Sequence, residues 1–275
     1  LGSIVGGFSF YLLLESTGYV DSKIISWSGQ GLFWFLILFF VSIYYTTIST
    51  SKLGFLRDLM TVTFARILRR KVVLHLHGGG FEEFYMNSPI FLKYFIRLNL
   101  KNSDKIVVLG KILMDQFYCT GSFIKEKLVV VPNGLSLGIT EPIARPKSIR
   151  NVKTINLLYL SNLMPSKGFL DTIKAVKTLN EMNLQYNFHL DLCGTFLGAI
   201  TEVSFEINSE NSLLNYIKNN DLQDFISYHG QVSGKRKKHF LAKAHIFVLP
   251  TYYPWEGQPL CIIEAMAFST PVISC

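Results

Sequence analysis

The amino-acid sequence predicts an α/β protein built from two doubly wound domains. Short apolar, β-branched runs alternate with helical stretches along the whole chain, which is typical of parallel sheets covered on both faces. A chain of 275 residues is long enough for two modest domains. Near its middle, Val131-Pro132-Asn133-Gly134 ends one such run with turn residues. We therefore predict domains at 1–134 and 152–275 that face each other across a cleft, with a linker at 135–151.

Strands are predicted where Val, Ile, Leu and aromatic residues gather in short runs bounded by turn residues. In the first domain these runs are 23–27, 44–49, 71–77, 105–109 and 128–131. In the second domain they are 154–160, 188–193, 226–229, 245–250 and 271–274.

Helices are predicted between most of these strands, because a parallel pair needs a long crossover connection. The helical candidates are 7–16, 32–43, 53–70, 89–99, 112–119, 169–182, 211–219, 235–244 and 259–268. Ligands of open α/β sheets bind beyond the carboxyl ends of the strands, so the residues that follow each strand are the candidates for function.

Composition and charge narrow the class of protein. Apolar residues form 49% and charged residues 17% of the chain, which excludes a disordered protein. The four cysteines are far apart and form no C-x-x-C pair, which favours a reducing compartment over a disulfide framework. The net charge is +8, of which +6 falls within 1–134. No nucleic-acid-binding motif is visible, so we expect an anionic membrane surface or a phosphorylated substrate as the partner.

One apolar run, 31–45, must be tested as a candidate membrane-spanning segment. It carries no charge, and a helix of that length spans about 22 Å, less than the hydrocarbon core of roughly 30 Å. We favour a buried or membrane-surface helix followed by a strand, and a true transmembrane span remains the alternative. The basic end of the helix 53–70, with Arg66, Arg69, Arg70 and Lys71, is a second candidate for contact with anionic lipid.

The strongest motif follows the strand 245–250. Glu256 lies in a turn, and Pro259 suits the first position of a helix. The backbone N–H groups near Gly257, Gln258 and Leu260 would then form an anion site at the start of a helix, with Glu264 one turn further along. Two carboxylates flanking an anion site suit a diphosphate that carries polyol groups. The structural alternative is a helix with one acidic residue favoured by the helix dipole and one exposed Glu.

The motif Glu256-x7-Glu264, within E-G-Q-P-L-C-I-I-E-A-M-A-F-S-T-P-V-I, resembles the signature of the retaining nucleotide-sugar glycosyltransferases of family 4. That family has the GT-B fold, with two Rossmann-like domains. The resemblance implies that Glu256 contacts the donor sugar and Glu264 the ribose, without a metal or other cofactor. Ser269 stands where the family usually has Gly. The resemblance covers about 6–275, and we expect the carboxyl-terminal domain to be truncated at Cys275.

A second motif, 158–168, follows the first strand of the second domain and ends in Lys167-Gly168. A cation at a helix entrance neutralises a diphosphate, although an isolated Lys-Gly pair is also typical of a surface turn. The stretch resembles the family's Gly-Arg-Leu…Lys-Gly loop, with Lys167 matching its Lys. Ser161-Asn162 replaces Gly-Arg, so Asn162 offers a hydrogen bond to a phosphate but no charge.

The third motif is His75-Leu76-His77-Gly78-Gly79-Gly80 at the end of the strand 71–77. His77 precedes three glycines that permit close approach of a ligand, whereas His75 is expected to be an interior residue. A metal is disfavoured because no third ligand is placed, and an esterase is disfavoured because no G-x-S-x-G motif exists. The stretch resembles the family's loop that directs a His to the donor sugar. Gly6 and Gly7 resemble its first glycine loop.

Together these features predict a retaining glycosyltransferase that moves a sugar from a nucleotide-diphosphate sugar to a lipid-linked or saccharide acceptor. We expect catalytic roles for His77, Lys167 and Glu256, and donor binding by the residues Gly6, Gly7, Gly78, Asn162, Gly257, Gln258, Pro259, Leu260 and Glu264. Its expected setting is bacterial surface polysaccharide synthesis, in the cytoplasm, peripheral at the inner face of the plasma membrane. The alternatives are a glycoside hydrolase or phosphorylase with paired Glu, and a non-catalytic nucleotide-sugar-binding module.

Overall fold

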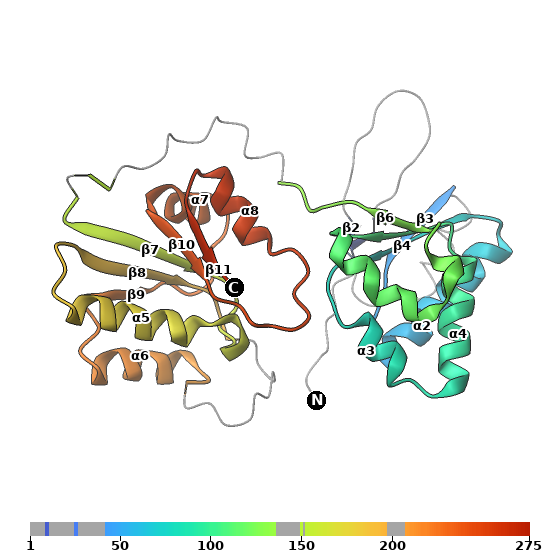
Figure 1. The fold of residues 1–275 in the computed structure, drawn as a ribbon, viewed down its shortest axis with the longest axis horizontal. Coiled ribbons are helices and arrows are strands. Elements are labelled where there is room, and N and C mark those ends of the chain that lie inside the picture. Colours follow the sequence, from blue (N-terminus) through green and yellow to red (C-terminus); the bar gives the residue numbers. More distant parts are fainter. Residues whose placement is uncertain (1–8, 11–24, 27–41, 136–148, 151, 197–206) are drawn as a thin grey trace. The chain divides into compact units, whose positions relative to one another are not determined.

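The computed structural model describes residues 9–10, 25–26, 42–135, 149–150, 152–196 and 207–275 (Figure 1). Its contacts divide the chain into two compact units, Leu1–Asn133 with Pro254–Gln258, and Gly134–Tyr253 with Pro259–Cys275. Sequence analysis assigned 254–258 to the second domain. The segment groups with the first unit instead, because its backbone and side chains bond to residues of that unit. Gly6, Gly7 and most of the predicted linker 135–151 lie outside the described residues.

The first unit contains a four-stranded parallel sheet in the order β3-β4-β5-β6. Its strands are β3 (Ile43–Thr47), β4 (Lys71–Leu76), β5 (Lys105–Val108) and β6 (Leu128–Val130). Alternate residues such as Val72, Leu74 and Leu76 point into the core, as the two-residue period of a strand requires. A short antiparallel ladder joins β1 (Ser9–Phe10) to β2 (Ile25–Ser26), so the predicted helix 7–16 is wrong at Ser9–Phe10.

The helices of the first unit lie on one face of its sheet (Figure 1). Because the four strands are adjacent in chain order, right-handed crossovers carry every connection to the same face. The connecting helices are α2 (Lys52–Ile67), α3 (Phe81–Met86) and α4 (Ile90–Asn102). Two 3-10 helices, Lys111–Thr120 and Ser122–Ile124, follow β5, where an α-helix was predicted at 112–119.

The second unit contains a five-stranded parallel sheet in the order β11-β10-β7-β8-β9. Its strands are β7 (Thr154–Leu160), β8 (Asn187–Cys193), β9 (Ile226–Tyr228), β10 (Ile246–Leu249) and β11 (Val272–Ser274). The chain builds outward from β7 through β8 and β9, then returns to place β10 on the other side of β7. This is the Rossmann-like strand order, and its switch point lies between β7 and β10.

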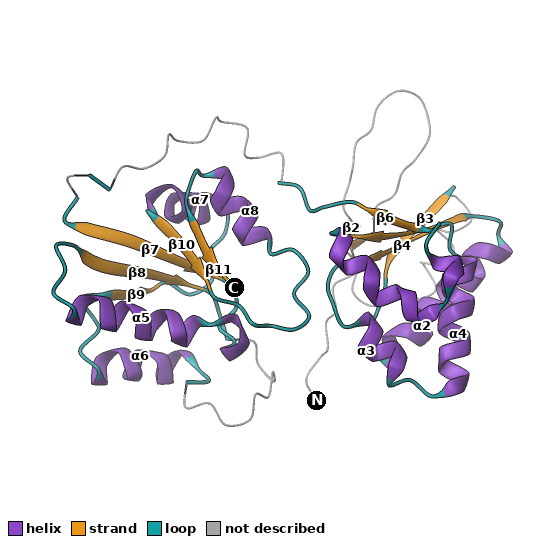
Figure 2. Ribbon diagram, in the orientation of Figure 1, coloured by secondary structure: helices purple, strands orange, loops and turns teal. Residues whose placement is uncertain are grey.

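Helices cover both faces of this second sheet, so the predicted doubly wound architecture is confirmed here. Figure 2 shows α5 (Phe169–Glu181) and α6 (Glu210–Asn219) on one side and α7 (Gly234–Lys243) and α8 (Leu260–Ala267) on the other. The central strands are buried on both faces, and the side chains of Tyr159, Leu190 and Phe247 are fully buried. In such folds, ligands bind beyond the carboxyl ends of the strands at the switch point, which are here the ends of β7 and β10.

None of the helices in the described parts of the chain is long and apolar enough to cross a bilayer. Of the apolar run 31–45, residues 31–41 lie outside the described residues, and Ile43–Thr47 forms β3.

Candidate functional site

Two loops meet at the switch point of the second unit. The loop 161–168 leaves β7 and the loop 250–253 leaves β10, and the backbone N–H of Tyr252 donates to the carbonyl oxygen of Ser166 at 2.8 Å. Gly168 has a φ of 73°, and a Cβ at this position would lie 2.3 Å from the carbonyl oxygen of Pro250. Only glycine tolerates both conditions. The Lys167-Gly168 pair is therefore part of a tight loop contact and not an ordinary surface turn.

Lys167 is half-buried at the end of the 3-10 turn Pro165–Lys167. Its ammonium nitrogen lies 4.8 Å from the centroid of the Tyr253 ring, within the range of a cation–π interaction. The buried hydroxyl of Tyr159 lies 3.2 Å from the carbonyl oxygen of Asn162 and 3.3 Å from that of Lys167. Tyr159 thus fixes both predicted phosphate-binding residues on one loop.

Sequence analysis missed Ser166, which precedes Lys167. Its hydroxyl is buried and has no hydrogen-bond partner among the described residues. Ser166 carries no sequence signal of its own, because its importance arises only from the contact between the two loops.

Helix α8 begins at Leu260, and Pro259 is its N-cap rather than its first helical residue as predicted. The carbonyl of Pro259 accepts the N–H of Ile262 at 3.2 Å. The N–H of Leu260 donates to no acceptor within the described ranges, so it remains available at the positive end of the helix.

Glu264 lies one turn into α8 and accepts a charge-assisted hydrogen bond from Lys237 of α7 at 2.5 Å. Lys237 lies in a run of basic residues, 235–238, and was not predicted as a partner of this carboxylate. The two residues are 27 positions apart, and only the packing of α7 beside α8 reveals the pair. Lys237 fixes the orientation of the predicted ribose-binding carboxylate.

The first unit holds the other predicted residues around the glycines that follow β4. The segment Pro254–Gln258 lies on this loop, and Gly79 donates its N–H to the carbonyl oxygen of Trp255 at 3.1 Å. A Cβ on Gly80 would lie 2.6 Å from Cδ1 of Trp255, and one on Gly257 would lie 2.2 Å from the carbonyl oxygen of His77. The glycines on both sides therefore permit two backbone segments to pack closely.

Side chains anchor the same segment at both ends. The indole N–H of Trp255 donates to Oε2 of Glu83 at 3.1 Å. The backbone N–H of Asn133 donates to Oε1 of Gln258 at 2.7 Å, and its side-chain amide donates to the Gln258 carbonyl at 3.0 Å. Glu256 lies between these anchors, next to the glycine that touches His77. Glu83 and Asn133 were missed because their partners lie more than 120 positions away in sequence.

His77 lies beside a second imidazole. The rings of His75 and His77 have centroids 3.9 Å apart, and Nδ1 of His75 is bonded to the hydroxyl of Tyr45. Burial, and to a lesser extent the neighbouring His77, lowers the pKa of His75 to about 4. Burial also lowers the pKa of His77. Near neutral pH both rings are neutral, so His77 offers a hydrogen bond to a sugar hydroxyl without adding positive charge.

Gln116 was also not predicted from the sequence, and its side chain holds the end of the glycine loop through hydrogen bonds. Its buried side chain accepts the N–H of Phe81, the first residue of α3, at 3.0 Å, and donates to the carbonyl of Leu113 at 2.9 Å. The short helix α3 was not predicted, because its start depends on Gly80 with a φ of 83°.

The predicted site residues thus fall into two groups. The first unit carries His77, Gly78, Glu256, Gly257 and Gln258, and the second carries Asn162, Lys167, Pro259, Leu260 and Glu264.

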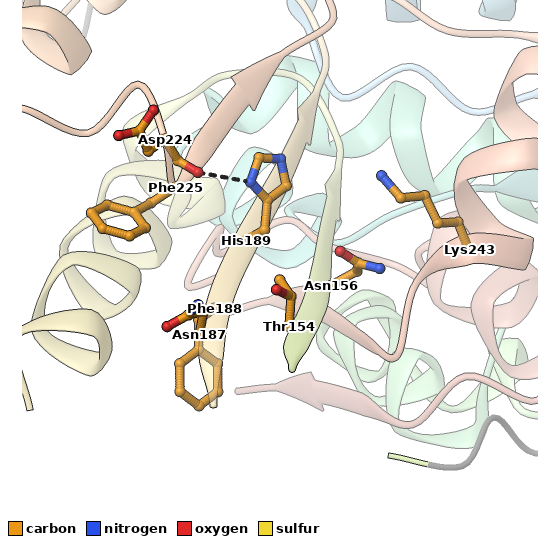
Figure 3. Close-up of a pocket in the computed structure, with 8 residues that line it drawn as sticks. All are labelled: Thr154, Asn156, Asn187, Phe188, His189, Asp224, Phe225 and Lys243. Carbon is orange, nitrogen blue, oxygen red and sulfur yellow. Dashed lines mark hydrogen bonds between the residues drawn. The ribbon is translucent and has the colours of Figure 1, made fainter. Parts of the chain in front are cut away.

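A separate open pocket of about 530 Å³ lies near the amino ends of β7 and β8 in the second unit (Figure 3). Figure 3 shows His189 of β8 bonded through Nδ1 to the carbonyl of Asp224, with Asn156 and Lys243 on the other side of the opening. The pocket contains none of the predicted site residues and lies at the opposite ends of the strands from Lys167. The part of the chain that the structure describes contains no group of three or more His, Cys, Asp or Glu side chains arranged to hold a metal.

Comparison with known proteins is consistent with this geometry. Residues 140–275 match the family model of glycosyl transferases group 1. The uncharacterised glycosyltransferase MJ1178 of Methanocaldococcus jannaschii is 26% identical over 203 residues, which are 74% of this chain and 48% of that protein. The chain therefore spans about half the length of this curated relative.

Solved structures share the fold. The Anabaena protein Alr3699/HepE, solved in complex with UDP and glucose, matches with a TM-score of 0.59 at 17% identity, over 87% of this chain and 60% of that one. Sucrose-phosphate synthase from Thermosynechococcus elongatus matches with a TM-score of 0.56 at 18% identity, over 85% and 56%. The fold of this protein is the GT-B fold of glycosyltransferases.

Proposed function

We propose that this protein is a retaining glycosyltransferase of family 4 that uses a nucleotide-diphosphate sugar as its donor. The observation that carries the proposal is the placement of Lys167 at the switch point of the second unit, within the residues 140–275 that match the glycosyl transferases group 1 model. A half-buried cation and the N–H groups of a helix start are the chemistry that a diphosphate requires.

The proposed mechanism assigns a role to each placed residue. As the sugar–phosphate bond breaks, negative charge grows on the leaving diphosphate, and Lys167 with the N–H of Leu260 stabilises it. The hydroxyl group of Ser166 and the side chain of Asn162 are further hydrogen-bonding groups on the same loop. Glu264, oriented by Lys237, accepts hydrogen bonds from the ribose. Glu256 and neutral His77 hold the sugar hydroxyls. No metal takes part in this scheme, so activity should survive treatment with EDTA.

The proposed acceptor is a lipid-linked or other saccharide, and the proposed setting is bacterial surface polysaccharide synthesis at the inner face of the plasma membrane. The support is the charge of 1–134, which holds +6 of the net +8. A basic surface suits both a diphosphate-linked acceptor and anionic lipid.

Product analysis tests this proposal. The purified protein is incubated with UDP- and GDP-sugars and simple acceptors, and the product is examined by NMR. We expect a glycoside with the anomeric configuration of the donor. An inverted product would refute retention, and release of free sugar at the rate of transfer would favour the hydrolase alternative. Donor binding without any product would favour the non-catalytic binding module.

A further inference from the structure

The outward face of α4 is apolar, contrary to what a helix in contact with water normally shows. Ile90 is 88% exposed, Phe91 66% and Tyr94 64%. The opposite side of the helix packs against the rest of the first unit, where Ile96, Asn99 and Leu100 are buried. The exposed residues therefore do not belong to the core of this unit.

Helix α2 has the same character and packs against α4. Leu53 is 84% exposed, Met60 57% and Ile67 69%, whereas Phe55 and Val62 face the core. Both helices lie on the same face of the sheet (Figure 1). We call the exposed apolar side chains of these two helices the outer surface; its members are Leu53, Leu56, Met60, Ile67, Ile90, Phe91, Tyr94 and Phe95.

The charges on this surface are of one sign. Helix α4 has no Asp or Glu and carries Lys93, Arg97 and Lys101 among its aromatic residues. No carboxylate of the described residues forms an ion pair with any of these three. Asp58, the only acid of α2, is buried and bonded to Arg57. The neighbouring acids, Glu82 and Glu83, lie on α3, where Glu83 is bonded to Trp255.

We propose that the outer surface of α2 and α4 docks on an anionic lipid bilayer. An apolar layer with interleaved cations and aromatic rings matches the interface of such a bilayer, where the rings enter the headgroup region and the cations meet lipid phosphates. This inference rests on the proposed function, which places the enzyme at a membrane, and adds which surface makes the contact.

This lipid-binding surface differs from the basic cluster 66–71 that the sequence suggested. The basic cluster 66–71 was the candidate for lipid, but Arg66 is bonded to Asp104 at 2.9 Å, and its charge is partly satisfied within the protein. The centre of the docking surface is instead Phe91 and Tyr94 of α4. The same helix carries Lys93 and Lys101, whose ammonium groups lie 5.7 Å from the centroid of the Tyr85 ring and 5.4 Å from that of the Phe123 ring.

Vesicle co-sedimentation tests the proposal with the full 275-residue chain. Vesicles of phosphatidylcholine with about 30% phosphatidylglycerol are compared with pure phosphatidylcholine at physiological salt. We expect binding to the anionic vesicles. Phe91→Ser/Tyr94→Ser should weaken it at least about tenfold. Lys93→Gln/Lys101→Gln should also weaken it by more than about tenfold, because each cation near the bilayer contributes about a factor of five.

The matched control is Met182→Ser/Leu214→Ser, which removes two exposed apolar side chains from the second unit. It should bind within about twofold of the wild type. Far-UV circular dichroism verifies that all variants are folded. The proposal would be overturned if the wild-type protein did not bind anionic vesicles, or if the Phe91→Ser/Tyr94→Ser variant bound them as tightly as the wild type.

Two further measurements separate the alternatives. Analytical ultracentrifugation shows whether the surface instead joins two copies of the chain; a dimer lost in Phe91→Ser/Tyr94→Ser, without vesicle binding, would also overturn the proposal. Calorimetry with nucleotide sugars is performed on the same proteins. If no donor binds, the proposed function fails while the vesicle result stands, and if only vesicle binding is absent, the docking surface alone fails.

Discussion

At the scale of single residues, His75 contributes an acid sensitivity to the first unit. Its folded pKa is about 4 because burial disfavours the charged ring, whereas an unfolded His titrates near 6.5. The unfolded state therefore binds the proton first, and stability is lost as the pH falls from about 6.5 towards 4.

His75→Asn removes this titration, and the variant tests the effect directly. Between pH 7 and pH 5, the stability of the wild type should fall relative to the variant by about 2 kcal/mol. Urea unfolding at the two pH values measures the difference. Val73→Ala, on the same face of β4, is the control, and its destabilisation should be equal at both pH values. Equal pH responses of wild type and His75→Asn would contradict this account.

The pair formed by Lys237 and Glu264 is a second feature at this scale. If Lys237 orients the carboxylate that holds the ribose, Lys237→Met should raise the donor KM about tenfold and leave kcat almost unchanged. Glu264→Ala should do the same, and the double variant should be no worse than Glu264→Ala. Steady-state kinetics measures these values, with the exposed Lys235→Met as the control. Additive effects of the two changes would show that Lys237 acts without Glu264.

At the scale of elements, the turn between β4 and α3 determines where Glu256 lies. Gly80→Ala places a Cβ against the Trp255 indole at a φ of 83°, so we expect a loss of about 1–3 kcal/mol in stability. Hydrogen exchange of the amides of 255–258 should accelerate, because the segment loses its packing contact with the glycine loop.

Gly110→Ala is the matched control for this turn. Its Cβ would meet nothing within 4 Å, and its φ of −160° is open to any residue. It should leave both stability and exchange of 255–258 unchanged. A Gly80→Ala protein as stable as Gly110→Ala would show that the packing of Trp255 on the glycine loop is unimportant.

At the scale of the whole molecule, the sequence predicted most of the sheet framework. β7 has the predicted bounds, and nine further strand runs overlap β2 to β6 and β8 to β11, because buried parallel strands are recognisable as dense apolar runs. The location of Lys167 at the switch point also follows from its position in the sequence, since the switch point lies at the ends of β7 and β10.

What the sequence did not reveal depends on contacts between distant positions. Pro254–Gln258 groups with the first unit through bonds to Gly79, Glu83 and Asn133. Helix α3 starts after Gly80, whose φ is 83°, and Pro259 is an N-cap with an extended backbone; neither feature has a distinctive sequence pattern. Lys237 appears as an ordinary surface charge until α7 is packed beside α8. These contacts position the predicted site residues, and the local sequence pattern around each residue does not reveal them.

The most direct test of the account is the binding of nucleotide-diphosphate sugars to the wild type and to Lys167→Ala, measured by isothermal titration calorimetry. Lys174→Ala, on the exposed side of α5, is the control. We expect at least one UDP-, GDP- or ADP-sugar to bind the wild type and the control equally, and Lys167→Ala to bind it at least about tenfold more weakly, because a charge-assisted contact contributes about 1.5–3 kcal/mol. Equal affinity of the wild type and Lys167→Ala would contradict the assignment of Lys167 to the diphosphate.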